Sequence, residues 1–411
     1  MLKKSISRVF IIIASIACLQ VLGTIILART LIKPEMGLYR LIITLVELGA
    51  LVSLLGIDHA FVRFFSSPAT AFQQYDWKGF LKKSAPVGIG LAIIFTAGVS
   101  IIYRFNLFIT LAIIIILIGL ALLFLFAAIL RAEKKYALSV FLARNNSLVF
   151  FLLLTILYFA NKLSFTNVVL FYMLSVLCGN FIIIPYCLKY LTNGTKPIPN
   201  SVLKNGLYYF GISISIMLMI YTGPLLIGKM LSYKDLAIYA VIASIMRLFE
   251  FTQDSAYYVL APHLNSKRDI RVKKIFLGLL GVSIIIAFFY ILFGKIIVHF
   301  FFKGLYDQGY CLLPFFVGIG IVRTLHVLPN SIIGGRSMEE TLRNQFYITL
   351  AAAIINMGLT YVFIRQWSLR GAASANLIAW SILFVATLLA TRRYMPNTGG
   401  YQENAYTYTS V

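Results

Sequence analysis

The sequence is poor in charged residues. Asp, Glu, Lys and Arg make up 12% of the 411 residues, whereas apolar and aromatic residues make up 60%. A soluble domain carries about 25% charged residues, so this chain has too few to cover the surface of a water-soluble globule of its size. The scarcity excludes a soluble enzyme, a disordered chain and a fibrous protein, and it leaves a polytopic membrane protein.

Acidic residues are the scarcest charged type, with 13 Asp and Glu against 36 Lys and Arg. On a soluble chain this excess would indicate nucleic-acid binding, but the long apolar runs leave no room for a solvated basic face, so we expect no nucleic-acid partner. The four cysteines lack the paired spacing of a metal site, and the chain has no GxxxxGK loop. We therefore expect no metal, no cofactor and no direct use of ATP.

What the chain has in abundance is long apolar runs. A bilayer-spanning helix needs about 20 mostly apolar residues, and the chain offers about twelve such windows. The predicted fold class is therefore an all-α polytopic membrane protein. The predicted spans are 9–32, 36–57, 85–103, 107–130, 136–160, 166–190, 205–231, 236–260, 275–301, 309–330, 346–365 and 371–391.

The connections between these spans differ in charge. Lys and Arg are about twice as frequent in the connections on one side as in those on the other, and cytoplasmic loops carry such an excess. This bias and the even number of spans predict that both termini are cytoplasmic. The connections on the opposite, outer side are all short.

The two halves of the chain carry an internal repeat. RTLIKPEMGLY at 29–39 and KMLSYKDLAIY at 229–239 align at a shift of 200 residues, so that Arg29 meets Lys229 and Tyr39 meets Tyr239. We predict a six-helix bundle at 1–195, a second at 200–391, and a polar cytoplasmic tail at 392–411. Each half has an even number of spans, so the halves run in the same direction and a pseudo-two-fold axis lies along the membrane normal. Two bundles with a cavity between them are typical of an alternating-access transporter.

Three segments resemble a known family. They are PEMGLY at 34–39, GIDHAFVRF at 56–64 and LRGAASA at 369–375. They are similar to the polysaccharide (O-antigen type) flippases of the multidrug/oligosaccharidyl-lipid/polysaccharide exporter superfamily. The resemblance implies a transporter, not an enzyme, in the bacterial cytoplasmic membrane. It implies that a lipid-linked oligosaccharide is flipped for lipopolysaccharide O-antigen synthesis, with membrane lipids, a polysaccharide polymerase and a chain-length regulator as further partners.

Ionisable residues inside the membrane are costly and usually face a cavity. A guanidinium stays charged and presents a fork that matches phosphate oxygens, so we predict that Arg144, Arg247 and Arg323 bind the pyrophosphate of the substrate. Each arginine has a structural alternative, which is an ion pair or a carbonyl contact. Arg247 and Glu250 in particular are spaced to neutralise each other on one helix face.

Three carboxylates at membrane depth are candidates for ion coupling: Glu47, Glu250 and Asp254. Protonating one of them would remove a charge and bias the equilibrium between two bundle arrangements. The alternative for Glu47 is an acid kept neutral by burial. Arg29 and Lys229, at the outer ends of the first and seventh spans, are predicted to receive the headgroup on the outer side, or else to snorkel to the lipid interface.

Two other functions stay open. One is a cation-coupled exporter of small molecules or drugs from the same superfamily, for which intramembrane arginines are a poor match. The other is a membrane-embedded glycosyltransferase or glycan polymerase, although the outer connections carry acidic residues only singly. We also expect Gly223–Pro224 to interrupt the seventh span as a gate hinge, because proline frees a backbone carbonyl.

Overall fold

The computed structural model describes residues 2–65, 75–133, 135–188, 195–198, 200–266, 272–336 and 339–392. These residues are almost entirely helical, and the extended backbone among them is an isolated bridge between Tyr75 and Lys196. The predicted tail at 392–411 lies outside the described residues except for Arg392, the last residue of the final helix.

The N-terminal elements are α1 (Leu2–Thr30), α2 (Lys33–Leu54), α3 (Ile57–Phe65), α4 (Trp77–Tyr103), α5 (Leu107–Ala132), α6 (Tyr136–Ala143), α7 (Asn145–Phe159) and α8 (Phe165–Leu188).

The second half of the described chain has the same kind of elements. They are α9 (Asn200–Met230), α10 (Tyr233–Ile245), α11 (Arg247–Ser266), α12 (Val272–Phe302), the 3-10 helix η2 (Asp307–Leu312), α13 (Leu313–Arg336) and α14 (Glu339–Arg392). We call α1–α8 the N-terminal bundle and α9–α14 the C-terminal bundle. The end of the molecule where α1 meets α2 is called the outer end, after the charge-based prediction.

Ten helices among the described residues are long and apolar enough to cross a membrane. One of them, α14, contains two spans, because its backbone leaves helical geometry at Ser368 with φ 49° and ψ −126°. At this point Gly371 packs so tightly that a Cβ would lie 2.0 Å from the Phe363 carbonyl oxygen. The predicted span at 236–260 corresponds to α10 and α11, which are not among these ten. The twelve predicted spans therefore correspond to helices of a multi-pass membrane fold.

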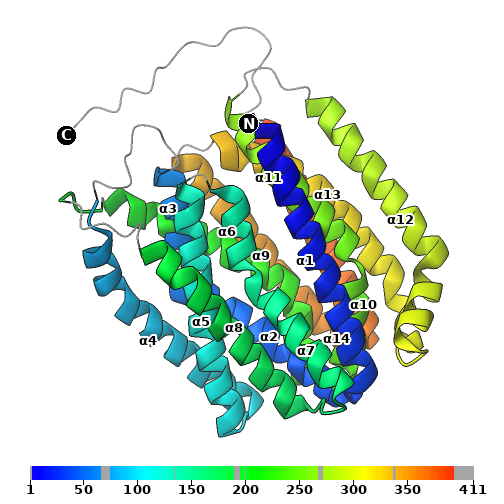
Figure 1. Cartoon of the computed structure of the whole chain (residues 1–411). Coiled ribbons are helices and arrows are strands. Elements are labelled where there is room, and N and C mark those ends of the chain that lie inside the picture. The colour runs from blue at the N-terminus through cyan, green and yellow to red at the C-terminus, as the bar shows by residue number, and fades with distance from the viewer. Residues whose placement is uncertain are drawn as a thin grey trace.

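The boundaries of the helices confirm the internal repeat. The first helix of each bundle ends at Thr30 and Met230, and the second begins at Lys33 and Tyr233. The shift of 200 residues seen in the sequence is therefore also the shift between the first two helices of each bundle. Figure 1 shows the repeat-related helices α4 and α12 at opposite edges of the molecule, as a pseudo-two-fold arrangement of two bundles requires.

The largest apolar core crosses from one bundle to the other. It joins residues of α1 and α2 with residues of α9, α10, α13 and α14, whereas a second core lies within the N-terminal bundle between α2, α5 and α8. Across the interface α2 packs against α9 and α10, α1 packs against α11, and α3 packs against α9. The bundles thus meet along α1–α3 and α9–α11, and this interface positions the charged residues described below.

Two predicted spans are broken near their middle. The span at 136–160 consists of α6 and α7 with Arg144 between them, and the span at 236–260 is divided at Met246 between α10 and α11. In contrast, our expectation that Gly223–Pro224 interrupts a helix was wrong, because α9 runs without a break to Met230. Gly223 instead makes room for Tyr239, since a Cβ there would lie 2.7 Å from the tyrosine hydroxyl.

Candidate functional site

Five of the predicted residues come together at the interface of the bundles. Arg144, at the break between α6 and α7, lies 3.4 Å (Nη2 to Oδ2) from Asp254 of α11. On α11 itself, Arg247 Nη1 donates to Glu250 Oε2 at 2.7 Å. Arg323 of α13 lies 3.8 Å (Nη1 to Oε1) from the same Glu250. We call these five residues the central cluster, and the Arg144–Asp254 contact joins the two bundles.

The side chains of the central cluster border accessible space. Arg144 and Asp254 keep 38% and 43% of their side-chain surface exposed, Arg247 and Glu250 keep 35% and 34%, and Arg323 keeps 21%. A charged side chain that is fully enclosed between helices loses its hydration, and this loss costs free energy. The side chains of the cluster therefore keep surface that no other described residue covers.

The central cluster contains more cations than anions, namely three guanidinium groups and two carboxylates. A further cation lies on α2, where Arg40 Nη2 donates to the hydroxyl of Thr24 at 2.7 Å. Its Nε atom is buried and has no hydrogen-bond partner within the described residues. Because guanidinium groups do not lose their proton in proteins, this part of the interface carries a net positive charge suited to an anion.

The arginines of the cluster are positioned by the local chain. Arg144 has φ −117° and ψ 9°, so the helix restarts directly after it, and Arg247 is the first residue of α11. Arg323 lies over the ring of Trp380 at 5.2 Å from its centroid, a cation–π contact that orients the guanidinium.

Glu47 lies on the N-terminal side of the same interface. It accepts a hydrogen bond from the hydroxyl of Tyr221 on α9, so this contact also crosses between the bundles. The sequence did not reveal Tyr221 as a partner, because nothing in its neighbourhood marks it. Glu47 therefore has a hydrogen-bond donor beside it, which fits the alternative in which this acid has a structural role. Its side chain is half-buried.

His326 and Asn330, which share the helix face of Arg323, are not in the cluster. His326 is 5% exposed and packs edge-on against Trp380, with 5.7 Å between the ring centroids. Asn330 accepts a hydrogen bond from Gln345 at 2.6 Å. These two contacts hold α13 against α14, so we regard both residues as structural.

Arg29 and Lys229 lie at the outer end, away from the central cluster. Arg29 donates to the carbonyl oxygens of Phe301 and Phe300 at 2.6 and 2.9 Å, at the end of α12. Lys229 donates to the carbonyl oxygen of Ile102 at 2.7 Å, at the end of α4. In this conformation both cations are thus engaged by helix ends of the opposite bundle.

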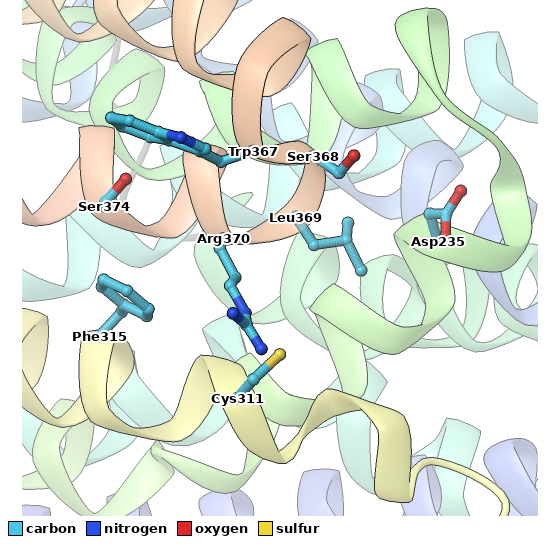
Figure 2. A pocket seen from close by; sticks show the side chains of 8 residues that line it. All are labelled: Asp235, Cys311, Phe315, Trp367, Ser368, Leu369, Arg370 and Ser374. Carbon is cyan, nitrogen blue, oxygen red and sulfur yellow. The ribbon is translucent and has the colours of Figure 1, made fainter.

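An open pocket of about 660 Å³ lies at the outer end of the C-terminal bundle. Figure 2 shows that it is lined from α10, η2, α13 and the turn of α14, with Arg370 reaching towards Cys311. None of the predicted site residues lines it. Among the described residues there is also no group of three or more His, Cys, Asp or Glu side chains that could hold a metal ion.

Comparison with known proteins places the fold. Neither a protein-family model nor a curated protein sequence matches the chain. The structure is similar to that of the MATE transporter VcmN of Vibrio cholerae, with a TM-score of 0.63 and 14% identity over 96% of each chain. It is also similar to the lipid II flippase MurJ in an inward closed conformation, with a TM-score of 0.64 and 14% identity over 93% of this chain and 87% of the other.

A third similar structure is a multidrug resistance MATE transporter of the MOP superfamily in an inward-facing conformation. Its TM-score is 0.60, with 15% identity over 94% of this chain and 98% of the other. Similarity at this level of identity concerns the fold. The chain therefore has the two-bundle fold of the MATE transporters and of the lipid II flippase.

Proposed function

We propose that this protein is a flippase that moves a polyprenyl-pyrophosphate-linked oligosaccharide across the bacterial cytoplasmic membrane by alternating access. The oligosaccharide would serve cell-surface polysaccharide synthesis such as that of the O-antigen, with both termini of the protein in the cytoplasm. A polysaccharide polymerase and a chain-length regulator are the partners expected in that process.

The observation that carries the proposal is the cation excess of the central cluster. A pyrophosphate bears oxygens that match the guanidinium fork in charge and geometry, and Arg144, Arg247 and Arg323 all retain accessible surface. An organic cation would meet repulsion from the same groups. The two-bundle fold supplies the remaining requirement, which is an interface that opens alternately to the two sides.

In the proposed mechanism the headgroup enters the interface while the polyprenyl tail stays in lipid. The phosphates compete with Asp254 for Arg144, a pair whose 3.4 Å separation marks a weak contact. Because that pair is one of the contacts between the bundles, its replacement removes one restraint on their relative movement. Glu47, Glu250 and Asp254 are the groups proposed to take up the coupling ion, and the loss of a charge there resets the cycle.

The test uses the purified protein in proteoliposomes. A fluorescent short-chain polyprenyl-pyrophosphate disaccharide is placed in both leaflets, and the fraction that becomes accessible to a membrane-impermeant quencher is followed with time. The matched control is an uncharged glycolipid with the same disaccharide and tail. The proposal expects rapid flipping of the pyrophosphate-linked probe and none of the uncharged one. Equal rates for the two lipids, or no flipping of either, would contradict it.

The second candidate is a cation-coupled exporter of small organic cations. The pairing of Arg247 with Glu250 at 2.7 Å favours it, because a neutralised arginine repels a cation less and leaves Glu47, which has no ion-pair partner among the described residues, as the binding group. The same proteoliposomes distinguish the two functions. An exporter would accumulate a fluorescent organic cation in response to a proton or sodium gradient, and it would not flip the pyrophosphate-linked lipid.

A further inference from the structure

The outer ends of the bundles are joined by the same kind of contact twice. Arg29, in the last turn of α1, donates Nε to the Phe301 carbonyl at 2.6 Å and Nη2 to the Phe300 carbonyl at 2.9 Å. Both carbonyls belong to the last turn of α12, which ends at Phe302. The contact therefore runs from the N-terminal bundle to the C-terminal bundle.

The second contact runs in the opposite direction. Lys229, in the last turn of α9, donates Nζ to the Ile102 carbonyl at 2.7 Å, in the last turn of α4. Arg29 and Lys229 are equivalent in the 200-residue repeat, and α4 and α12 are the third spans of their bundles. Each bundle thus extends a cation onto the end of the same helix in the other bundle.

A helix end is a suitable acceptor for such a cation. The last four carbonyl groups of a helix have no partner within the helix, and they carry the negative end of its dipole. A Lys or Arg side chain placed there satisfies the carbonyls and is stabilised by them. Separating the bundles would break these hydrogen bonds, and a hydrogen bond to a charged group contributes more to stability than one between neutral groups.

The region between the two contacts is closed by apolar packing. Met36, Leu41, Leu236 and Ala237 are fully buried where α2 crosses α10. The crossing is so close that a Cβ on Gly37 would lie 1.8 Å from the Tyr233 carbonyl oxygen. Further contacts flank it, since Lys33 lies 5.6 Å from the ring centroid of Tyr306 and Tyr103 donates to the Leu225 carbonyl at 3.1 Å.

From this geometry we infer that Arg29 and Lys229 are paired clamps that hold the outer gate closed and release together when the protein opens outward. Figure 1 places α4 and α12 at opposite edges, so the clamps act on the two sides of the gate. One clamp alone would let the bundles pivot about it, whereas two on opposite sides resist both separation and pivoting. The inference requires alternation between two bundles and makes no use of the substrate.

The test measures the opening of the outer end directly. Spin labels are attached at Leu107→Cys in the N-terminal bundle and Leu305→Cys in the C-terminal bundle, two outer positions that are 74% and 45% exposed, after the four native cysteines are replaced. The distance distribution is recorded by pulsed electron paramagnetic resonance. The clamp variant Arg29→Met, Lys229→Met removes the donors and keeps side chains of similar length. We expect the long-distance, outward-open population to rise relative to the short one by roughly tenfold or more.

Two controls complete the experiment. Arg104→Met, Lys303→Met removes two cations from the neighbouring outer connections, and it should leave the distance distribution unchanged. Arg29→Lys, Lys229→Arg keeps both donors and should also resemble the unmodified pair. A clamp variant with the distribution of its control would overturn the inference, as would an exchange variant that opens as much as the methionine variant. No substrate is present, so this result is independent of whether the protein flips a glycolipid.

Discussion

The outer ends of the two bundles are alike, whereas their centres are opposite. At the outer end the repeat-related residues Arg29 and Lys229 are both cations, and both contact a helix end of the other bundle. At the centre the residues related by the same shift of 200 are Glu47 and Arg247. Their surroundings differ too, since Glu47 accepts a hydrogen bond from a tyrosine and Arg247 donates to Glu250.

The difference follows from what each position faces. A cation at the outer end contacts backbone carbonyls, and both bundles provide these carbonyls at equivalent positions. Cations at both repeat-related positions therefore do not destabilise the outer end. Near the pseudo-two-fold axis a like-charged pair would repel at low dielectric. Opposite charges avoid this, and the C-terminal half supplies two of the three arginines proposed to bind phosphate, Arg247 and Arg323. The halves have therefore diverged at the centre, where we place the substrate.

The largest effect is expected from making the centre symmetrical. Glu47→Arg places a cation at both repeat-related positions and removes the acceptor of Tyr221, so transport should fall by roughly a hundredfold or the protein should fail to fold. The matched control Glu47→Gln adds no cation beside Arg247 and should keep the native yield of monodisperse protein. Unchanged transport by Glu47→Arg would show that the charge at this position is unimportant.

A second variant separates the structural and transport roles of Arg144. Arg144→Gln leaves Asp254 without its partner, and transport should fall by about tenfold or more. If the ion pair only holds the bundles together, the neutral pair Arg144→Gln, Asp254→Asn will restore the rate, because no charge is then left alone. Asp254→Asn alone shows the effect of losing the carboxylate, and the account expects the neutral pair to be slower than this variant, since the substrate itself needs the arginine. The flipping assay described above provides the measurement.

The close crossing of α2 and α10 gives an effect on stability. Gly37→Ala introduces a methyl group against the Tyr233 carbonyl, and such overpacking costs about 1–3 kcal/mol. Gly98→Ala is the control, because no atom of another helix in the described part of the chain lies within 4 Å of a Cβ at that position of α4, and alanine favours a helix by about 0.5–1 kcal/mol. Thermal unfolding should thus show opposite shifts for the two variants. Shifts in the same direction would mean that the crossing is looser than described.

The smallest effect is expected at the hydrogen bond between Tyr221 and Glu47. Tyr221→Phe removes a neutral donor, which contributes about 0.5–1.5 kcal/mol, so transport should change by only a few fold.

Glu47→Gln keeps a hydrogen-bonding side chain but no longer titrates, and transport should lose its dependence on an ion gradient. Comparing rates with and without the gradient tests both variants. A gradient response that survives in Glu47→Gln would exclude Glu47 as the coupling group.

The fold was predictable because its signals are long. Apolar runs define the spans, and the match of 29–39 with 229–239 located the repeat whose helix boundaries the structure reproduces. The breaks at Arg144 and Met246 were missed, because a change in the backbone at one residue leaves no trace in hydropathy. The continuous α9 shows the reverse error, since a proline in a membrane helix does not always interrupt it.

The site was predictable only in part. The spacing of Arg247, Glu250 and Asp254 indicated one helix face, and charge at membrane depth drew attention to Arg144 and Arg323. Their partners were not predictable, because the contact of Arg144 with Asp254 joins residues far apart in the chain. The contacts of Arg29 and Lys229 could not be predicted from the sequence for a different reason. Their acceptors are backbone carbonyls, and every residue has one.

The most direct test of the account neutralises the arginines of the central cluster together. Arg144→Gln, Arg247→Gln, Arg323→Gln is compared with Arg365→Gln, an arginine on α14 that stacks on Tyr361 outside the cluster. In proteoliposomes that contain equal amounts of monodisperse protein, the account predicts that the triple variant flips the pyrophosphate-linked lipid at less than about one hundredth of the native rate, a loss of about 2.7 kcal/mol. The single variant should keep the native rate. A triple variant that flips the lipid as fast as the native protein would contradict the account.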